Sequence, residues 1–319
     1  MVTREPASCE RPSPSRSPPR GYGFVRLVRD TVYGLSLLVA SPLLAWRLIR
    51  TGKWRTDWPG RFGRIETSEA PPVSSAGELP RTVLIHGVSV GEVNATRTLV
   101  DELLSGEGPE LRVIVSATTD TGFDRARGLY GDRLEVVRFP LDFSASVSRF
   151  LDGVRPDVLV LMELELWPNL CAAAESRGIP LVVVNGRLSE GSFRNYRLIR
   201  RLVRPMFASV EVAAVQTAVY GKRFQELGVP PDRIRVTDNM KWDTASLADR
   251  IEGAETLAGE MGIDPSRPLL VAGSTGPGEE AFLLERCPDT VQLLVAPRRP
   301  ERFDEVAALD STFVRRSSP

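Results

Sequence analysis

Short apolar runs rich in β-branched residues alternate with helical patterns from residue 81 onward, and this alternation limits the possible folds more than any other feature. The runs predicted as strands are Val83–His86, Arg112–Ser116, Leu134–Phe139, Asp157–Leu161, Leu181–Val184, Val210–Val215 and Arg233–Val236. Strands that are apolar throughout, with helices between them, are typical of a parallel sheet covered on both faces. The sequence therefore predicts an α/β fold with a doubly wound, Rossmann-like domain over residues 57–237.

A second, shorter α/β pattern follows a polar connector. Leu269–Ala272 and Val291–Ala296 are predicted strands, and only sixteen residues follow Phe303. Two parallel strands leave unpaired edges and do not make a stable domain by themselves. We therefore expect residues 238–319 to form a connector and an incomplete second Rossmann-like domain.

The N-terminal segment has a different composition. Residues 1–21 are rich in Pro, Ser and Arg, which predicts a disordered tail. The sixteen residues Thr31–Trp46 carry no charge, and as a helix they would reach about 24 Å, short of a ~30 Å hydrocarbon core. Basic residues on both sides suit anionic headgroups. Residues 22–56 are therefore predicted to form a membrane-anchor helix and its flank, monotopic or barely spanning; the alternative is a buried core helix.

Composition excludes several classes of protein. The chain has 41 basic and 41 acidic side chains, so its formal net charge is zero, whereas nucleic-acid binders usually carry a basic excess. Three scattered cysteines and one histidine make a disulfide framework or a zinc site improbable on counting alone. We expect no cofactor and no nucleic-acid partner, whereas counting leaves open a metal held by carboxylates alone.

The stretch HGVSVGEV, His86–Val93, joins the first predicted strand to a helical pattern at Glu92–Leu104. Turns of this kind line the ligand crevice at the carboxyl ends of parallel strands. A helix N-terminus stabilises the ionised form of Glu92, which could then accept a proton from a hydroxyl. The alternative is structural, because Glu is common in first helical turns.

The stretch MELELWPN, residues 162–169, lies at the end of another predicted strand. Glu163 and Glu165 are two positions apart, so an extended backbone would point both carboxylates to one side. Paired carboxylates bind sugar hydroxyls or divide acid and base roles. The alternative is an ordinary capping region in which Trp167 packs.

Three further stretches could hold anions. A predicted basic amphipathic helix, Ser192–Phe207, carries Arg194 and Arg197 and follows Arg187, which suits acidic lipids or a phosphorylated substrate. GSTGPGEE, residues 273–280, could cradle phosphate at a helix start, although it lacks the dinucleotide fingerprint. PRRPERF, residues 297–303, offers the guanidinium groups of Arg298, Arg299 and Arg302. Each has a plain alternative, a solvated helix face or a surface loop.

Taken in order, these stretches resemble one family, the 3-deoxy-D-manno-octulosonic acid (Kdo) transferases of lipopolysaccharide assembly. The resemblance covers roughly residues 30–305. It includes the apolar N-terminal segment and the stretches HGVSVGE, MELELWPN, NGRLSEGSFRNY, VQTAVYGKRFQELG, DNMKWD, GSTGPGEE and PRRPERF. Each motif alone is modest, whereas eight in the right order are specific.

The resemblance implies a GT-B glycosyltransferase on the cytoplasmic face of the inner membrane, with two Rossmann-like domains and a cleft between them. Such enzymes transfer Kdo from CMP-Kdo to a lipid A precursor, lipid IVA, with inversion and without a metal. The family's general base matches Glu92 and its second essential acid matches Glu163. The remaining matched residues are Ser274, Thr275, Arg298 and Lys241 on the donor side, and Arg187, Arg194 and Arg197 on the acceptor and lipid side.

The chain departs from the family pattern at some positions. Gly276 and Arg299 stand where the family usually has His, and Asp238 stands where it usually has Gly. The glycine-rich turn and the later nucleotide-holding segment of the family would follow residue 319. The sequence thus predicts a truncated or frameshifted member with weak donor binding. Two alternatives remain: another GT-B enzyme, such as a heptosyltransferase or a nucleotide-sugar epimerase, and a non-catalytic remnant that binds acidic lipid.

Overall fold

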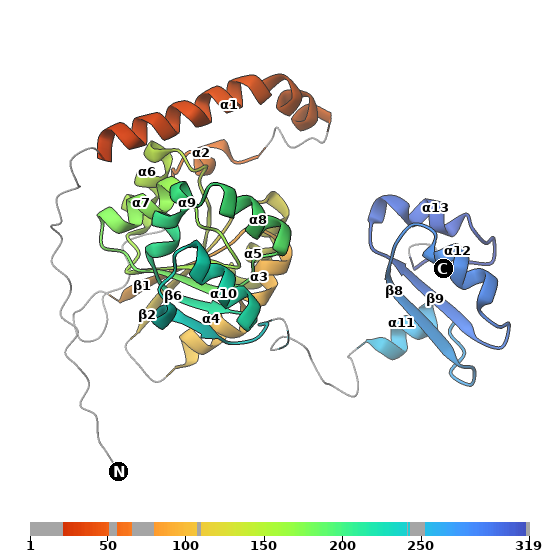
Figure 1. Cartoon of the computed structure of the whole chain (residues 1–319). Coiled ribbons are helices and arrows are strands. Elements are labelled where there is room, and N and C mark those ends of the chain that lie inside the picture. The colour runs from red at the N-terminus through yellow and green to blue at the C-terminus, as the bar shows by residue number, and fades with distance from the viewer. Residues whose placement is uncertain are drawn as a thin grey trace, which may run out of the picture. The chain divides into compact units, whose positions relative to one another are not determined.

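The computed structural model describes residues 22–50, 56–65, 80–106, 110–240, 242 and 253–316. The chain divides into two compact units, Met1–Ala245 and Ser246–Pro319 (Figure 1). The predicted disordered tail, residues 1–21, lies outside the described residues, as does most of the connector between the two units.

The first unit is built on a parallel sheet. Its described strands are β1 (Arg81–Gly87), β2 (Leu111–Ala117), β3 (Glu135–Arg138), β4 (Val158–Met162), β5 (Leu181–Gly186), β6 (Val210–Val215) and β7 (Ile234–Val236). They lie in the order β3-β2-β1-β4-β5-β6-β7, and every neighbouring pair is parallel. This confirms the predicted α/β class and the doubly wound sheet.

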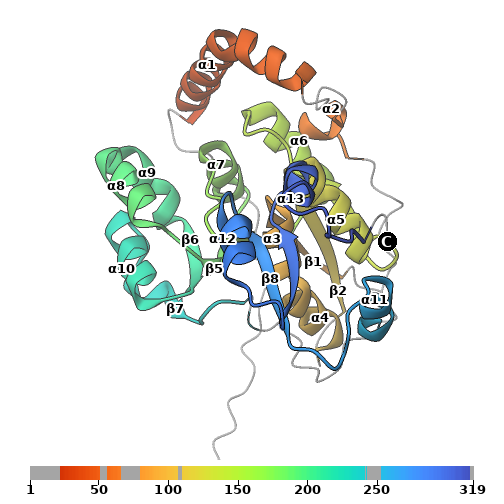
Figure 2. The same cartoon turned by 90° about the vertical axis from the view of Figure 1, so that its right-hand side faces the viewer.

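Helices cover both faces of this sheet (Figure 2). One face packs against α3 (Val90–Ala95), α4 (Arg97–Ser105) and α5 (Asp120–Tyr130). The other packs against α6 (Ser144–Val154), α7 (Pro168–Ser176), α8 (Glu190–Leu198), α9 (Arg200–Ala208) and α10 (Ala218–Leu227). Neighbouring strand residues serve opposite faces: Leu84 belongs to the second of these cores, while Val83 and Ile85 belong to the first.

Two predicted helices are each divided in the structure, and α5 lies where no helix was predicted. The pattern at Glu92–Leu104 breaks at Thr96, whose hydroxyl donates to the Val93 carbonyl (2.7 Å) and contacts the Tyr130 hydroxyl (2.9 Å). The basic helix breaks at Ile199 (φ −107°, ψ 25°), which lets α8 and α9 each bury an apolar face. Helix α5 escaped prediction because its inner face is largely small residues.

The N-terminal helix α1 spans Tyr22–Arg50 and contains Pro42. Proline has no N–H to donate to the carbonyl four residues earlier, and the Ser41 hydroxyl donates to that Leu38 carbonyl instead (2.8 Å). Among the helices that the structure describes, none is long and apolar enough to cross a membrane. The spanning form of the predicted anchor is therefore not supported.

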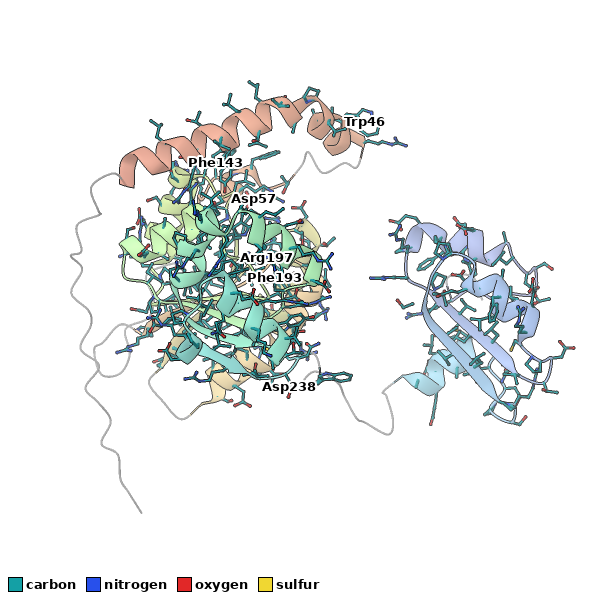
Figure 3. The ribbon with its side chains drawn as sticks, in the orientation of Figure 1. Trp46, Asp57, Phe143, Phe193, Arg197 and Asp238 are labelled. Carbon is teal, nitrogen blue, oxygen red and sulfur yellow. The ribbon has the colours of Figure 1, made fainter. Side chains whose placement is uncertain are left out.

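A short helix, α2 (Trp58–Arg61), is attached to the sheet by charged groups. Asp57, labelled in Figure 3, caps it by accepting from the Gly60 N–H (2.9 Å). Arg61 lies 3.4 Å from an Asp120 carboxylate oxygen, which also accepts from Arg138 at 2.9 Å. Burial raises the pKa of Asp120, but a hydrogen bond from Thr56 and these cations leave it below its ordinary value.

The second unit is also α/β. It contains α11 (Ala254–Glu260), β8 (Leu269–Thr275), α12 (Glu279–Arg286), β9 (Gln292–Pro297) and α13 (Phe303–Ala307), and β8 pairs with β9 in parallel. Glu280 is fully buried and accepts two hydrogen bonds from Arg302, at 2.7 and 2.9 Å. These hydrogen bonds lower the pKa of Glu280 to about 2. Strand β8 leaves Leu269, Leu270 and Val271 exposed.

We predict that Gly63→Ala destabilises the first unit by at least about 1 kcal/mol. Gly63 has φ +79°, and a Cβ there would lie 2.1 Å from the Ser146 carbonyl oxygen. Gly128→Ala is the matched control, because a Cβ at that position in α5 meets nothing within 4 Å and alanine favours helices. Urea unfolding measures both; equal stability of the two variants would contradict the argument.

Candidate active site

The sheet reverses its strand order between β1 and β4, which are parallel neighbours with Val83 opposite Val158. In doubly wound folds, ligands bind beyond the carboxyl ends of the strands at such a switch point. The turn after β1 carries Glu92, and the segment after β4 carries Glu163 and Glu165. The structure thus places two stretches that are seventy residues apart in sequence at the same edge.

Both carboxylate oxygens of Glu92 accept hydrogen bonds from its own turn. Oε2 accepts from the Val88 N–H and Oε1 from the Ser89 hydroxyl, each at 2.8 Å. Ser89 precedes the first residue of α3, but its side chain makes no capping bond, and Glu92 accepts from the Val88 N–H instead of the Ser89 N–H, so the turn is not a capping box. These bonds orient the carboxylate and leave lone pairs for another donor. Glu92 therefore stabilises its own turn, and the same bonds orient it for the proposed role as a base.

Gly87 at the end of β1 leaves room for the Glu92 side chain. A Cβ at Gly87 would lie 3.2 Å from the Glu92 Cβ, closer than such atoms usually approach. The glycine therefore permits the close approach of the turn to the strand.

Glu163 bends the backbone where β4 ends. Its φ is +55°, in the left-handed region, so the segment does not continue as the extended strand assumed from the Glu163–Glu165 spacing. The Glu163 N–H donates to the Val184 carbonyl (3.0 Å), and the Glu163 carbonyl accepts from the Arg187 N–H (3.4 Å). These contacts attach the start of the segment to the end of β5.

Glu165 is the most perturbed carboxylate at this edge. Its Oε2 accepts from the Trp167 indole N–H at 2.9 Å. Burial, followed by the nearby charges of Glu92 and Glu163, raises the pKa of Glu165 to about 7, although the Trp167 bond lowers it. Burial and the charge of Glu165 also raise the pKa of Tyr196. The site therefore holds a carboxyl group that is partly protonated at neutral pH beside two other acids.

The predicted acceptor-side arginines lie on the exposed surface that follows β5. Arg187, Arg194 and Arg197 are exposed; Arg194 pairs with Glu190, and the Arg197 guanidinium lies 6.0 Å from the centre of the Phe193 ring (Figure 3).

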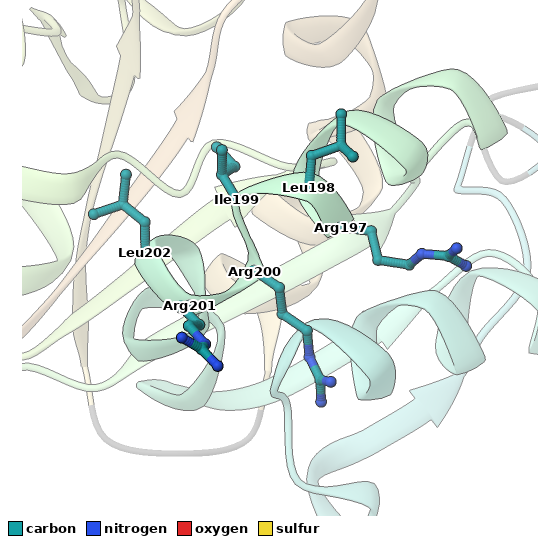
Figure 4. Close-up of a pocket in the computed structure, with 6 residues that line it drawn as sticks. All are labelled: Arg197, Leu198, Ile199, Arg200, Arg201 and Leu202. Atoms are coloured by element: carbon teal, nitrogen blue, oxygen red, sulfur yellow. The ribbon is translucent and has the colours of Figure 1, made fainter.

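The junction of α8 and α9 forms an open hollow of about 430 Å³. Arg197, Arg200 and Arg201 point to one side of it, and the exposed Leu198, Ile199 and Leu202 to the other (Figure 4). A second hollow of about 260 Å³ adjoins it, lined by Ser192, Asn195, Tyr196 and Ile199.

The predicted donor-side residues lie at the carboxyl ends of β8 and β9, except Lys241, which is outside the described residues. Ser274 is exposed with φ +61°, Thr275 is buried and Arg298 is exposed. The Arg298 N–H donates to the Thr275 carbonyl (3.1 Å), which brings the two turns together.

Two anion-binding expectations for the second unit need correction. Arg302 is not available to a ligand in the way that its motif suggested, because it is buried and pairs with Glu280. In the glycine-rich turn, the Gly276 N–H donates to the carboxylate of Glu279 (2.7 Å), so the chain's own acid occupies part of that helix start.

Several residues at the sheet edge were not predicted as part of the site. Asp142 lies in the loop that precedes α6 and Asn169 lies in the first turn of α7, and they hydrogen-bond to each other. Asn185, at the end of β5, is buried with φ +54°, and its Oδ1 accepts from the Met240 N–H (3.2 Å). The sequence signals near Asn169 and Asn185 are the WPN and NGR triplets, and neither triplet indicates the distant hydrogen-bond partners of these side chains.

Two further observations concern strain and metal ligands. Asp238, labelled in Figure 3, has φ +59°, a conformation that glycine adopts most easily, and it is the position where the family usually has Gly.

His86 is fully buried and stacks on Phe139 with ring centres 3.6 Å apart, and burial lowers its pKa to about 3. Within the described ranges, no three or more His, Cys, Asp and Glu side chains gather as a metal site.

Comparison with known proteins identifies relatives of this chain. A family model described as 3-deoxy-D-manno-octulosonic-acid transferase (kdotransferase) matches residues 56–244. The 3-deoxy-D-manno-octulosonic acid transferase of Haemophilus influenzae is 33% identical over 304 residues, covering 90% of this chain and 68% of the relative. That of Bordetella pertussis is 33% identical over 297 residues, covering 87% and 66%. The chain thus spans about two thirds of the length of these relatives.

Solved structures resemble the chain at low sequence identity. A UDP-GlcNAc 2-epimerase from Neisseria meningitidis has a TM-score of 0.48 at 13% identity, covering 73% of this chain and 70% of its own. A lipopolysaccharide outer core galactosyltransferase, WaaB, has a TM-score of 0.42 at 10% identity, covering 72% and 64%.

We predict that Glu165→Gln changes the dependence of stability on pH. The pKa of Glu165 is about 7 in the folded protein, above the ordinary 4.5. The contribution of this carboxyl group to the free energy of unfolding is therefore fully present below pH 4.5 and is lost as pH rises through about 7. The variant does not titrate there, so its stability relative to the parent should rise by about 1 kcal/mol or more between pH 5 and pH 8. The urea midpoint at each pH measures this.

Glu175→Gln, at an exposed position of α7, is the control for that experiment. Its stability should follow the parent's pH dependence. Parallel curves for the parent and Glu165→Gln would show that this carboxyl group ionises normally and would contradict the prediction.

Proposed function

This chain belongs to the 3-deoxy-D-manno-octulosonic acid transferase family, and we propose that it transfers Kdo from CMP-Kdo to a lipid A precursor, lipid IVA. The acceptor side is proposed to lie at the switch point of the first unit. The observation that carries the proposal is the clustering of Glu92, Glu163 and Glu165 beyond β1 and β4. The reaction would invert the anomeric centre and require no metal.

In the proposed reaction, Glu92 accepts the proton of an acceptor sugar hydroxyl as that oxygen attacks the anomeric carbon of Kdo. The new carbon–oxygen bond forms while the bond from that carbon to the CMP phosphate breaks, and CMP leaves as an anion. The bonds from Val88 and Ser89 support this role, because a base held in one orientation loses little freedom on reaching the transition state.

Glu163 and Glu165 are proposed to bind the acceptor sugar beside this base. Glu163 is the proposed second essential acid. A protonated Glu165 can donate a hydrogen bond to a sugar oxygen, which an ionised carboxylate cannot do. Its raised pKa supports that role at neutral pH.

The donor is proposed to bind at the carboxyl ends of β8 and β9. CMP-Kdo carries a phosphate and a carboxylate, which suit the exposed guanidinium of Arg298 and the turn at Ser274 and Thr275. Lys241 is proposed as a further donor-side cation, on the basis of its motif alone.

The lipid acceptor requires a membrane surface, proposed to be the cytoplasmic face of the inner membrane. Arg187, Arg194 and Arg197 would face its phosphates and the anionic headgroups. Helix α1 would lie on the surface as a monotopic element: Trp46 is exposed, with the Arg50 guanidinium 5.1 Å from the centre of its ring (Figure 3). Aromatic and basic side chains together favour the interfacial region.

Non-catalytic binding of acidic lipid is a second candidate function. The hollow at the junction of α8 and α9 favours it, because three arginines and three exposed apolar side chains meet there. Lipid binding would explain this exposed surface, but it assigns no role to Glu92, Glu163 and Glu165.

We predict that Glu92→Gln lowers the rate of Kdo transfer from CMP-Kdo to lipid IVA by about 100-fold or more, because glutamine cannot accept the proton. Product formation is measured with the full chain and detergent-dispersed acceptor. Glu102→Gln, at an exposed position of α4, is the control and should retain the parent rate.

Two outcomes would overturn this assignment. Parental activity in Glu92→Gln would remove that carboxylate from the mechanism. Turnover by the parent with a UDP- or ADP-sugar, and none with CMP-Kdo, would favour another nucleotide-sugar enzyme. If the parent binds acidic lipid but transfers no sugar from any donor, the non-catalytic candidate is supported.

We predict that replacing Arg197, Arg200 and Arg201 together by Gln weakens binding to vesicles with anionic lipid. Each basic residue near such a surface contributes about 1 kcal/mol, so the partition coefficient should fall by roughly 100-fold at low salt. Arg127→Gln, on α5 at the other face of the sheet, is the control. Co-sedimentation measures the effect; equal loss in the control, or none in the triple variant, would contradict it.

A further inference from the structure

Helix α1 is attached to the first unit by three polar side chains near its N-terminal end. Arg29, Asp30 and Tyr33 share one side of the helix, since positions i and i+4 lie above each other. Arg29 donates to the Pro168 carbonyl (2.8 Å), and the Tyr33 hydroxyl donates to Asp142 (3.1 Å). Asp30 accepts from the Ser144 N–H (3.1 Å) and from the Ser144 hydroxyl.

These contacts reach the N-terminal ends of α6 and α7, at the carboxyl edge of the sheet. Figure 1 shows α1 lying over this side of the unit. The Tyr33 and Phe143 rings also meet edge to face, with centres 6.0 Å apart. The attachment is therefore specific in geometry and lies beside the segment that carries Glu163 and Glu165.

Asp142 caps α7 from a distant part of the chain. The residue that precedes α7 is Trp167, whose side chain makes no capping bond. Asp142 accepts instead from the Asn169 N–H (3.0 Å) and the Leu170 N–H (2.9 Å), two donors in the first turn of α7. The carboxylate therefore determines where α7 begins.

Asn169 joins this cap to α1. It is buried, and its amide nitrogen donates to Asp30 (3.0 Å) and to the Asp142 carbonyl (2.6 Å). One side chain thus connects the N-terminal helix, the loop before α6 and the start of α7.

We propose that α1, through Tyr33 and Asp30, positions the Glu163–Trp167 segment of the site, with Asp142 and Asn169 as its positioning residues. The segment is held at two ends. Its first residue bonds to the end of β5, and its last residue leads directly into the capped turn of α7. Loosening the cap frees the second end, and the carboxylates between the two ends lose their defined geometry.

This assignment gives α1 a role beyond attachment to lipid. An anchor joined by a flexible linker would leave the site unchanged if the anchor were altered. Here the helix hydrogen-bonds to the first two residues of α7, Pro168 and Asn169, and to Asp142, which caps that helix. A change on α1 therefore reaches the end of the segment that leads into α7. The inference rests on the proposed function only in taking Glu163 and Glu165 as site residues.

The first test is amide hydrogen exchange in the full chain with Tyr33→Phe. This change removes one hydroxyl and retains the ring against Phe143. The Asn169 and Leu170 amides should exchange about five-fold faster, which corresponds to the loss of one hydrogen bond. Thr31→Val is the matched control, because the Thr31 hydroxyl donates within α1, to the Leu27 carbonyl (2.8 Å).

The second test observes the segment itself. In protein labelled with 5-fluorotryptophan, the fluorine resonance of Trp167 is assigned with Trp167→Phe and followed with pH. It should report ionisation of Glu165, which faces Glu92 of α3, Glu163 of its own segment and Tyr196 of α8. A looser segment hydrates Glu165, so the midpoint should fall from about 7 in the parent to a lower pH in Tyr33→Phe and in Asp30→Asn.

Unchanged exchange and an unchanged midpoint in both variants would overturn the proposal, and so would equal changes in Thr31→Val. A lowered melting temperature without either local change would show that α1 is a stabilising element only, which also overturns it. Neither readout depends on transfer activity. Failure of the proposed reaction would therefore leave this test intact, and failure of this test would leave the proposed reaction intact.

Discussion

The reversal of strand order between β1 and β4 is the constraint on which the rest of the first unit depends. The helices that follow β1 and β2 pack on one face of the sheet, and those that follow β3, β4, β5 and β6 pack on the opposite face. The turns after β1 and β4 therefore lead away from each other. The crevice between them is not filled by backbone, so side chains can enter it. Glu92 enters that space from one turn, and Glu163 and Glu165 enter it from the other. Without the reversal, a helix would cover this edge and the three acids would not meet.

The sequence predicted the strands well because burial on both faces demands continuous apolar residues, as in β4, Val158–Met162, whose sequence is VLVLM. It predicted helix breaks poorly. The break at Thr96 depends on a contact with Tyr130, which is 34 positions away and invisible to local periodicity. For the candidate site, position relative to a strand end pointed to Glu92 and Glu163, and their roles were implied by the family resemblance; both stay predictions. The capping of α7 by Asp142 could not be predicted, since Asp142 lies 28 positions before Leu170, in the loop that precedes α6, and no local signal links the two residues.

Residues of the proposed site also stabilise the fold at this edge. Glu92 lies in the first turn of α3, and its bonds to Val88 and Ser89 hold its carboxylate in one orientation. Asp142 satisfies two N–H groups of α7 at the cost of burial, which raises its pKa to about 6. Burial also raises the pKa of Glu165, to about 7, because its bond from Trp167 does not offset burial and the charges of Glu92 and Glu163.

The buried pair in the second unit has a consequence for how this sequence can vary over time. Glu280 and Arg302 are 22 positions apart, yet each satisfies the other where little water reaches. A substitution that removes either side chain leaves the other as an unpaired buried charge, whereas replacing both by apolar groups leaves no buried charge. The two positions are therefore expected to change together across relatives. Arg302, which the PRRPERF motif suggests as a ligand-binding residue, would then be conserved because it pairs with Glu280 of the preceding helix.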